Sequence, residues 1–336
     1  MTSLGDQLAN CAGSLATAYD AALLDLDGVV YRGTEPIPHA ASSLTAAAEA
    51  GMRLTYVTNN ASRTPEQVAE LLRAVGVDAD PSDVATSAQA AATLLAEQLE
   101  PGARVLVIGA AALRLAVSDR GLTPVSSADD EPAAVVQGFS PDTTYAMLAE
   151  ATLAIRAGAL WIATNLDSTI PAARGVLPGN GALVSAVATA TGATPIAAGK
   201  PQRPLHDEAV RRTGSRTPLV VGDRLDTDID GALAVGAHSL LVLTGVTSLL
   251  ELALVPAGRR PSYVGMDLQA LLTAHRPVEI DDSAARCGGA IAKFAAGEVA
   301  ITAGGDATDA VRAGVAAAWR AVDRGDPVSA VRGCDR

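Results

Sequence analysis

The chain has 336 residues and a formal net charge of −12, with 25 Lys and Arg against 37 Asp and Glu. This length allows two or three domains. The acidic balance argues against nucleic acid as a partner, because that affinity depends on Lys and Arg that neutralise phosphates. Apolar residues make up 49% of the chain, which excludes wholesale disorder and allows a sizeable core. No apolar run approaches the roughly 18 residues of a membrane span, so we expect no membrane partner.

Short aliphatic runs alternate with Ala-rich stretches over most of the chain. The predicted strands are Ala21–Asp25, Arg53–Thr58, Arg104–Ile108, Ala133–Gln137, Leu160–Ala163, Thr217–Val221 and Ser239–Leu243. The predicted helices are Thr64–Val75, Ser87–Leu99, Leu113–Arg120, Thr143–Ala157, Ala182–Thr191, His206–Gly214 and Ile229–Val235. Continuous apolar strands between helices are typical of a parallel sheet that is covered on both faces, which predicts an α/β fold.

The sequence changes in character after about Asp281. The runs Ala290–Phe294 and Glu298–Thr302 are separated by a short turn, which predicts a hairpin. Asp306 suits the N-cap of a helix that continues to about Asp323. We therefore expect a small appended module, to which composition assigns no chemistry.

The cysteines and the first residues bear on the compartment. Cys11, Cys287 and Cys334 share no metal-type spacing and are too few for a disulfide scaffold, so we interpret them as isolated reduced thiols. The first residues carry neither the basic flank nor the apolar stretch of a signal peptide. We therefore expect a cytoplasmic protein.

The first chemical motif is a pair of carboxylates at the end of an apolar run, Asp25 and Asp27, followed by Gly28. In open α/β sheets the ligand crevice lies at the carboxyl ends of the strands. Carboxylates there can bind a divalent cation through hard oxygens, or one can act as a nucleophile while the other moves protons. The alternative is a strand that ends in a solvated acidic turn.

A second motif, Thr58 and Asn59, ends the next apolar run. Its hydroxyl and amide donors, with backbone N–H groups that lead into a helix near Thr64, would suit a phosphate. The alternative is an ordinary strand-to-helix turn that Thr64 caps.

A third motif places Lys200 between Gly199 and Pro201. A lysine on such a constrained loop could reach a phosphate as a point charge. It is not a Walker A lysine, because Pro201 replaces the Ser or Thr that would hold Mg²⁺. The alternative is an ordinary surface lysine.

The fourth motif is an acidic cluster, Asp223, Asp226 and Asp228, after another apolar run. Crowded carboxylate oxygens favour Mg²⁺ or Ca²⁺ over Zn²⁺, which prefers His and Cys. The spacing does not match an EF-hand loop. The alternative is a helix N-terminus that is enriched in Asp for dipole reasons.

Together, the four motifs resemble those of the haloacid dehalogenase-like phosphohydrolases. Asp25-Leu26-Asp27-Gly28 matches the first motif, Thr58-Asn59 the second, Lys200 the third, and Gly222-Asp223 with Asp228 the fourth. Asp27-Gly28-Val29-Val30-Tyr31-Arg32-Gly33 and Asn59-Asn60 look like the branch that contains NagD, pyridoxal phosphatase, and the phosphoglycolate and glycerol-3-phosphate phosphatases. The resemblance covers about residues 20–275 and not the tail.

This resemblance implies a three-layer Rossmann-like core with a parallel sheet, an inserted α/β cap of type 2, and a small C-terminal α+β extension. The core would span residues 1–100 and 194–280, the cap 101–193, and the extension, of unknown role, 281–336. About 140 residues separate the second motif from the third, more than one βα unit needs, which favours an inserted domain.

The resemblance also implies roles for single residues. Asp25 would attack phosphorus and form an aspartyl-phosphate, while Asp27 would protonate the leaving alkoxide and then activate water. Mg²⁺ would be held by Asp25, the backbone carbonyl of Asp27 and Asp223, with Asp228 supporting the metal or its waters. The phosphoryl oxygens would be held by Thr58, Asn59 and Lys200.

In the cap, the segment Asn165–Asn180 is expected to reach the active site. The expected substrate contacts there are Asn165, Asp167 and Arg174. The alternative for Asn165 and Asp167 is a cap loop that satisfies its own backbone.

We therefore predict a Mg²⁺-dependent phosphomonoesterase that acts on a small phosphorylated metabolite, with glycerol 3-phosphate and 2-phosphoglycolate as the leading candidates. The open alternatives are pyridoxal 5′-phosphate or a nucleoside monophosphate as substrate, phosphotransfer to a second hydroxyl, and a non-catalytic regulatory protein. A dinucleotide-dependent dehydrogenase is disfavoured, because no G-x-G-x-x-G follows the first strand. A homodimer through the cap or the extension is a further expectation.

Overall fold

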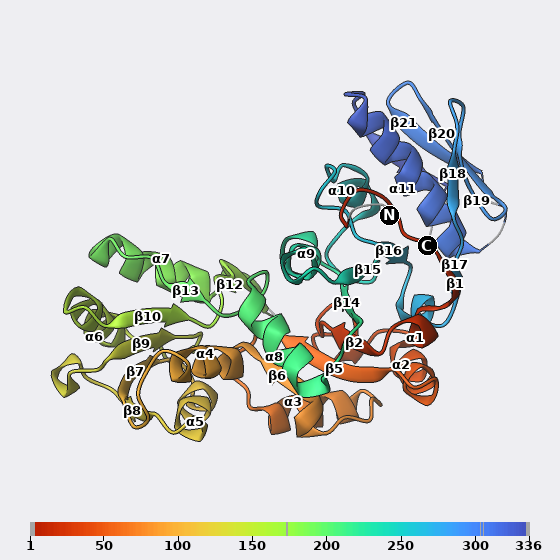
Figure 1. Cartoon of the computed structure of the whole chain (residues 1–336). Coiled ribbons are helices and arrows are strands. Elements are labelled where there is room, and N and C mark those ends of the chain that lie inside the picture. The colour runs from red at the N-terminus through yellow and green to blue at the C-terminus, as the bar shows by residue number, and fades with distance from the viewer. Residues whose placement is uncertain (1–3, 173, 303, 305, 334–336) are drawn as a thin grey trace. The chain divides into compact units, whose positions relative to one another are not determined.

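The chain folds into two compact units, each assembled from separate stretches of sequence (Figure 1). The computed structural model describes residues 4–172, 174–302, 304 and 306–333. The first unit consists of Met1–Tyr56, Leu72–Asp78 and Val210–Arg336, and the second of Val57–Leu71 and Ala79–Ala209. The described part of the C-terminal extension thus belongs to the first unit.

The first unit is built on a parallel sheet with the strand order β16-β15-β14-β2-β5. Its strands are β2 (Ala21–Leu24), β5 (Arg53–Thr58), β14 (Pro218–Gly222), β15 (His238–Val242) and β16 (Tyr263–Gly265). Every residue of β2 is buried, as expected for an aliphatic strand in the middle of a covered sheet. The predicted strands in this unit are confirmed, with ends that shift by one residue at most.

Short helices and turns connect these strands. They are α1 (Leu15–Ala18), α2 (Ala40–Glu49), a π-helical turn (Leu225–Ile229), α9 (Asp230–Val235), α10 (Leu249–Ala253) and a 3₁₀ turn (Leu268–Leu271). Two small pairings complete this part, β1 (Cys11–Ser14) with β17 (Ala274–His275) and β3 (Tyr31–Arg32) with β4 (Glu35–Pro36). The division between the units falls inside β5, so that Val57 and Thr58 belong to the second unit, and inside α3 (Pro65–Ala74) and α8 (Arg203–Thr213).

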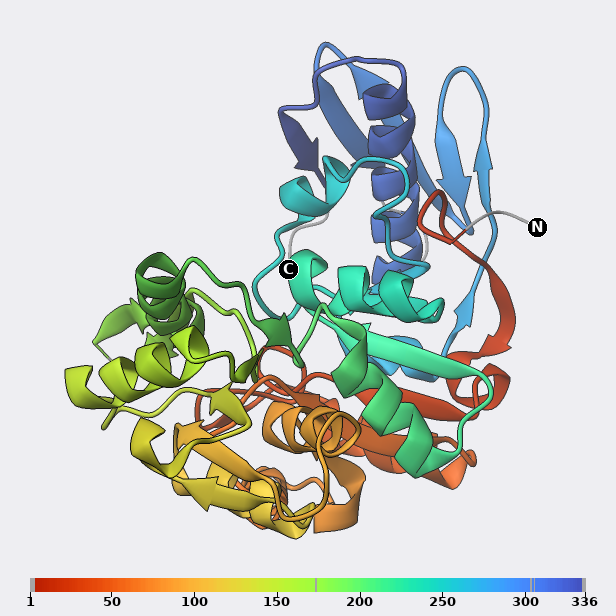
Figure 2. The same cartoon turned by 60° about the vertical axis from the view of Figure 1, so that its left-hand side comes forward.

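The extension forms a second sheet with one long helix on it (Figure 2). The helix is α11 (Ala307–Asp323), and the Asp306 carboxylate accepts the Asp309 N–H at 2.8 Å. This bond confirms Asp306 as the predicted N-cap residue of the helix. The strands, in the order β18-β19-β20-β21-β22, are β18 (Val278–Ile280), β19 (Ala285–Cys287), β20 (Ala290–Ala295), β21 (Glu298–Thr302) and β22 (Ala330–Arg332). The predicted hairpin and helix are therefore present, and three further short strands widen the sheet.

The second unit has three layers around a parallel sheet with the order β13-β10-β9-β7-β8. The strands are β7 (Arg104–Ile108), β8 (Thr123–Val125), β9 (Ala134–Gln137), β10 (Leu160–Ala163) and β13 (Ile196–Ala197). The helices are α4 (Ser87–Ala96), α5 (Ala111–Asp119), α6 (Tyr145–Arg156) and α7 (Asn180–Thr191). Helices α6 and α7 share one apolar cluster with β7, β9 and β10, and α4 packs on α5.

The remaining elements of the second unit are small. They are β6 (Val84–Thr86), a hairpin of β11 (Thr169–Ala172) and β12 (Gly175–Pro178), and 3₁₀ turns at Pro81–Asp83 and Ala128–Asp130. Within the described residues, no helix has the length and apolar character needed to cross a membrane. Cys11 and Cys287 are free thiols, and Cys334 lies outside the described residues.

Candidate active site

Three carboxylates meet at one edge of the sheet in the first unit. Asp25 directly follows β2, Asp223 directly follows β14, and Asp228 lies in the π-helical turn. One oxygen from each of the three lies within 4.8 Å of the others. They meet because β2 and β14 are parallel neighbours, so the ends of both strands reach the same edge. The structure thus brings close together three carboxylates that we expected to act at one site.

Glycines leave the room that these carboxylates occupy. A Cβ built on Gly245 would lie 1.9 Å from Asp223 Oδ2, and one on Gly222 would lie 2.2 Å from the Asp228 Cβ. A Cβ on Gly28 would lie 2.5 Å from Asp223 Oδ2, and its φ of +86° is unfavourable for other residues. The carboxylates therefore fill the space that larger side chains would take. No motif in the sequence marks Gly245 as a site residue.

Backbone groups fix the orientation of the two buried carboxylates. The Val246 N–H donates to Asp223 Oδ2 at 2.6 Å, and the Arg224 N–H donates to Asp228 Oδ2 at 3.1 Å. The Thr247 N–H donates to the Asp223 carbonyl at 3.2 Å. Such bonds to an ionised carboxylate are stronger than bonds between neutral groups, so these loops hold the oxygens in place.

The carboxylate group fits a hard divalent cation. Asp223 is 0% exposed and Asp228 1% exposed, so their negative charges are removed from water at a short mutual distance. Close buried like charges repel strongly, and a cation among them offsets that repulsion. Carboxylate oxygens without His or Cys are the ligands that Mg²⁺ and Ca²⁺ prefer.

Asp27 lies apart from this carboxylate group. Its side chain is exposed in the turn after β2, where the Gly28 N–H donates to the Tyr31 carbonyl at 2.8 Å. Among the described residues, the carboxylates that lie close enough together to hold a metal ion are those of Asp25, Asp223 and Asp228. The Asp27 carboxylate is not one of them. An exposed carboxyl in this turn is accessible to a substrate and to water.

In the second unit, Asn59 connects three other predicted site residues. Its Nδ2 donates to the Asp167 carboxylate at 3.2 Å and to the Lys200 carbonyl at 3.1 Å, and its Oδ1 accepts the Lys200 N–H at 2.8 Å. The Asn165 Nδ2 donates to the Asn59 carbonyl at 2.7 Å. The Asn59 side chain is thus committed to protein partners, and it fixes the loop that carries Lys200.

Lys200 and Thr58 are two further buried polar residues close to this asparagine. Lys200 is 4% exposed, and its Nζ lies 3.4 Å from the Val57 carbonyl. Thr58 ends β5 and accepts the Asn60 N–H through Oγ1 at 3.1 Å. A buried ammonium at the end of a strand provides positive potential for an anion. Arg174, in contrast, is exposed in the turn between β11 and β12 and is not part of this arrangement.

His206, to which the sequence analysis assigned no role, is a buried neighbour of this lysine. It is 1% exposed in α8, and its Nδ1 has no hydrogen-bond partner in the part of the chain that the structure describes. Burial, and secondarily the Lys200 ammonium, lower the pKa of His206 from 6.5 to about 3. The imidazole is therefore neutral in the folded protein at ordinary pH.

This neutral histidine makes the stability depend on pH. Between pH 6.5 and about 3 the unfolded chain binds a proton at His206 that the folded chain does not. The free energy of unfolding should therefore fall as pH falls through this window, by up to about 1.4 kcal/mol per pH unit from this residue. Urea unfolding at pH 7 and pH 5 should show a smaller pH effect in His206→Leu than in the wild type. Equal pH effects in the two proteins would contradict this assignment.

Comparison with known proteins identifies the family of this chain. A haloacid dehalogenase-like hydrolase family model matches residues 22–123, and a HAD-hydrolase-like model matches residues 197–271. The D-glycerol 3-phosphate phosphatase of Mycobacterium tuberculosis is 48% identical over 317 residues, which cover 92% of this chain and 88% of that protein. The chain belongs to the haloacid dehalogenase-like hydrolase family. The predicted family is thereby confirmed.

Solved structures of this family agree with the fold. The crystal structure of a glycerol phosphate phosphatase from Mycobacterium tuberculosis in complex with calcium matches with a TM-score of 0.84 and 46% identity, over 95% of each chain. The same protein in complex with magnesium matches with a TM-score of 0.82 and 45% identity, over 96% of this chain and 95% of that one. The predicted α/β haloacid dehalogenase-like fold with a C-terminal extension is confirmed, and the chain is a hydrolase of phosphate monoesters.

Proposed function

We propose that this chain is a Mg²⁺-dependent phosphomonoesterase whose substrate is glycerol 3-phosphate. The observation that carries the proposal is the group formed by Asp25, Asp223 and Asp228, in a chain that aligns over 92% of its length with a D-glycerol 3-phosphate phosphatase. That group would supply both an oxygen-rich cation site and a nucleophilic carboxylate.

The reaction would proceed in two displacements. The Asp25 carboxylate attacks phosphorus, the bond from phosphorus to the ester oxygen breaks, and Asp27 gives its proton to the leaving alkoxide. Asp27 then takes a proton from water, whose oxygen attacks the aspartyl-phosphate and releases inorganic phosphate and free Asp25. When bound by Asp25, Asp223 and the backbone carbonyl of Asp27, with Asp228 in support, Mg²⁺ would supply positive charge for the phosphoryl oxygens.

We also propose residues that bind the phosphoryl group. We assign Lys200 and Thr58 to the phosphoryl oxygens, as an ammonium and a hydroxyl donor. The Asn59 side chain bonds to Lys200 and Asp167, which supports a positioning role for it. Asn165, Asp167 and Arg174 remain proposed substrate contacts, within a proposed cap at residues 101–193.

The partners follow from the same chemistry. The relatives are phosphatases, so the substrate is a small phosphorylated metabolite and nothing points to nucleic acid or a membrane. We add to the proposal a cytoplasmic location and a homodimer through the cap or the extension.

The proposal is tested by inorganic phosphate release from the purified full chain. With Mg²⁺, glycerol 3-phosphate should be hydrolysed faster than 2-phosphoglycolate, pyridoxal 5′-phosphate or a nucleoside monophosphate. EDTA should abolish release, and an excess of Mg²⁺ should restore it, because the carboxylates repel one another and the phosphate without a cation. Preference for another compound in the panel would replace the substrate, and release unaffected by EDTA would overturn the metal dependence.

A further inference from the structure

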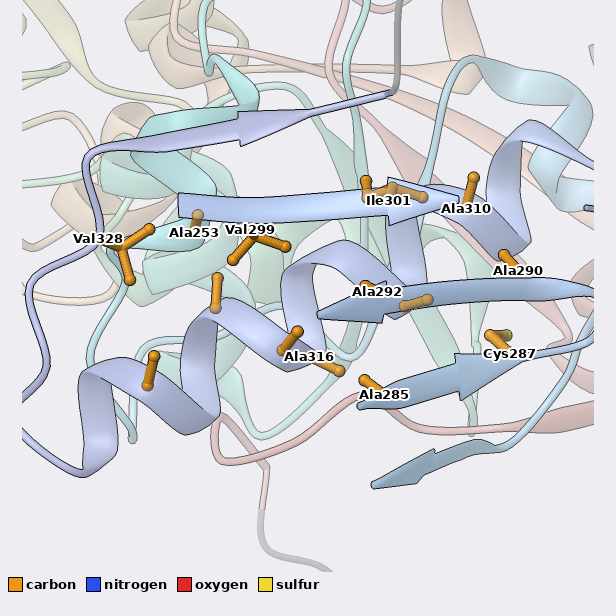
Figure 3. Packing of buried hydrophobic residues seen from close by; sticks show 14 residues of the cluster. Ala253, Ala285, Cys287, Ala290, Ala292, Val299, Ile301, Ala310, Ala316 and Val328 are labelled. Carbon is orange, nitrogen blue, oxygen red and sulfur yellow. The ribbon is translucent and has the colours of Figure 1, made fainter. Parts of the chain in front are cut away.

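Helix α11 of the extension carries two different apolar faces. One face packs on the extension sheet, where Val299 and Ile301 of β21 and Ala292 of β20 lie in one cluster with Ala316 (Figure 3). The other face presents Val311, Val315 and Trp319 to the main sheet of the first unit. The helix therefore contributes to two hydrophobic cores, that of the extension and that of the main sheet of the first unit. A module that was merely appended would need only the first.

The second face shares its cluster with the turn that carries a predicted metal ligand. Ile229, directly after Asp228, is 0% exposed in this cluster, and Leu225 of the same π-helical turn packs against it. Val311 and Val315 of α11 are also 0% exposed there. Because interiors are close-packed, a change in volume at α11 displaces the other members of the cluster.

Trp319 also makes a directed contact with α10. Its indole Nε1–H donates to the Leu252 carbonyl at 2.8 Å, and the ring is only 3% exposed. The Arg260 guanidinium lies over the ring, 4.8 Å from its centre, and donates to Asp323 and to the Val255 carbonyl. The indole is held by a hydrogen bond at its edge and by a guanidinium over its face, so it fixes where α10 lies.

Helix α10 in turn fixes a loop that contacts Asp223. The loop of residues 244–248 leads directly into α10, and Ser248 and Glu251 cap that helix reciprocally. Within the loop, the N–H groups of Val246 and Thr247 donate to the Asp223 carboxylate and carbonyl. A continuous path of contacts thus runs from Trp319 through α10 to a buried metal-ligand candidate.

We propose that Trp319 is a positioning residue for the cation site, so that the C-terminal extension takes part in metal binding without contacting the metal. This inference rests on the proposed function for one premise, namely that the cation bound at this site is Mg²⁺. It assigns to the extension a role that its sequence did not indicate. Groups behind the ligands of a metal site commonly determine its affinity by orienting those ligands.

The test compares the two tryptophans of the full-length chain by the same substitution. Trp319→Phe removes the N–H that holds α10. Trp161→Phe changes a similarly buried residue of β10 whose Nε1 has no hydrogen-bond partner among the residues described. Calorimetric titration with Mg²⁺ should give a Kd raised about threefold to thirtyfold in Trp319→Phe and a wild-type Kd in Trp161→Phe. Stoichiometry in the same titration reports the folded fraction, so partial unfolding is distinguished from weaker binding.

A second pair of variants covers the case in which Trp319→Phe does not fold. Val315→Ala and Val299→Ala remove the same two methyl groups at positions that are both 0% exposed, but only Val315 shares the cluster of the metal-binding turn. Both should lower the melting temperature, and only Val315→Ala should weaken Mg²⁺ binding. Equal Mg²⁺ affinity in the folded variants and the wild type would overturn the inference and leave the proposed function intact. A wild-type chain that binds no Mg²⁺ would overturn both.

Discussion

Asp25→Asn is expected to lower the rate of phosphate release from glycerol 3-phosphate by at least about 10⁴-fold. An amide oxygen is a poor nucleophile toward phosphorus, so the first displacement has no efficient route. Asp25 follows β2 directly, and the Asp25 N–H donates to the Val221 carbonyl at 2.8 Å, so the substitution leaves the backbone bond intact. Initial rates at saturating substrate and Mg²⁺ measure the effect.

The matched control for this variant is Asp78→Asn, which removes one negative charge from an exposed position of the same unit. It should retain the wild-type rate. If folded Asp25→Asn hydrolysed the substrate within about tenfold of the wild-type rate, Asp25 would not be the nucleophile. Mass spectrometry of the wild type mixed with substrate should also reveal a phosphorylated peptide that contains Asp25.

The second large effect is expected for Gly245→Ala. The added methyl would lie 1.9 Å from Asp223 Oδ2 and 2.3 Å from its carboxyl carbon, so the whole carboxyl group must move. Displacing a buried carboxylate that binds the cation should raise the Kd for Mg²⁺ by about 10- to 100-fold, as changes next to metal ligands commonly do. Titration calorimetry and the Mg²⁺ dependence of phosphate release should report the same change.

Gly13→Ala provides the control for that substitution. Gly13 lies in β1 of the same unit, and its Cβ would meet only Thr17 Oγ1 at an ordinary contact distance of 3.4 Å. This variant should bind Mg²⁺ like the wild type. Unchanged Mg²⁺ affinity in folded Gly245→Ala would show that Asp223 is not a ligand.

The sequence was sufficient to predict where the principal strands lie, because aliphatic runs between helices identify buried parallel strands. That Asp25 and Asp223 belong to one site was implied by the resemblance of the motifs to a known family. Helix α2 was missed for a physical reason. It begins after His39, which has a φ of 65° and makes no capping bond, and its buried side chains are mostly small. Neither a start signal nor a strong apolar period marks it.

Features that depend on contacts distant in sequence could not be predicted. The need for glycine at position 245 arises from the Asp223 carboxyl, which the fold brings beside it. The partners of the Asn59 side chain likewise come from two other segments, those of Asp167 and Lys200. Local sequence indicated polar residues at a strand end but not whether they bind a ligand or one another.

The strand order of the first unit has a consequence for synthesis on the ribosome. Strand β14 lies between β2 and β15, yet it begins at Pro218, after the second unit ends at Ala209. Since a chain emerges from its N-terminus and domains fold as units, the second unit can finish folding while the first still lacks its central strand. The apolar strand β2 emerges early and stays without one of its two neighbours until then. A nascent chain of this protein therefore carries an exposed aggregation-prone edge for most of its translation.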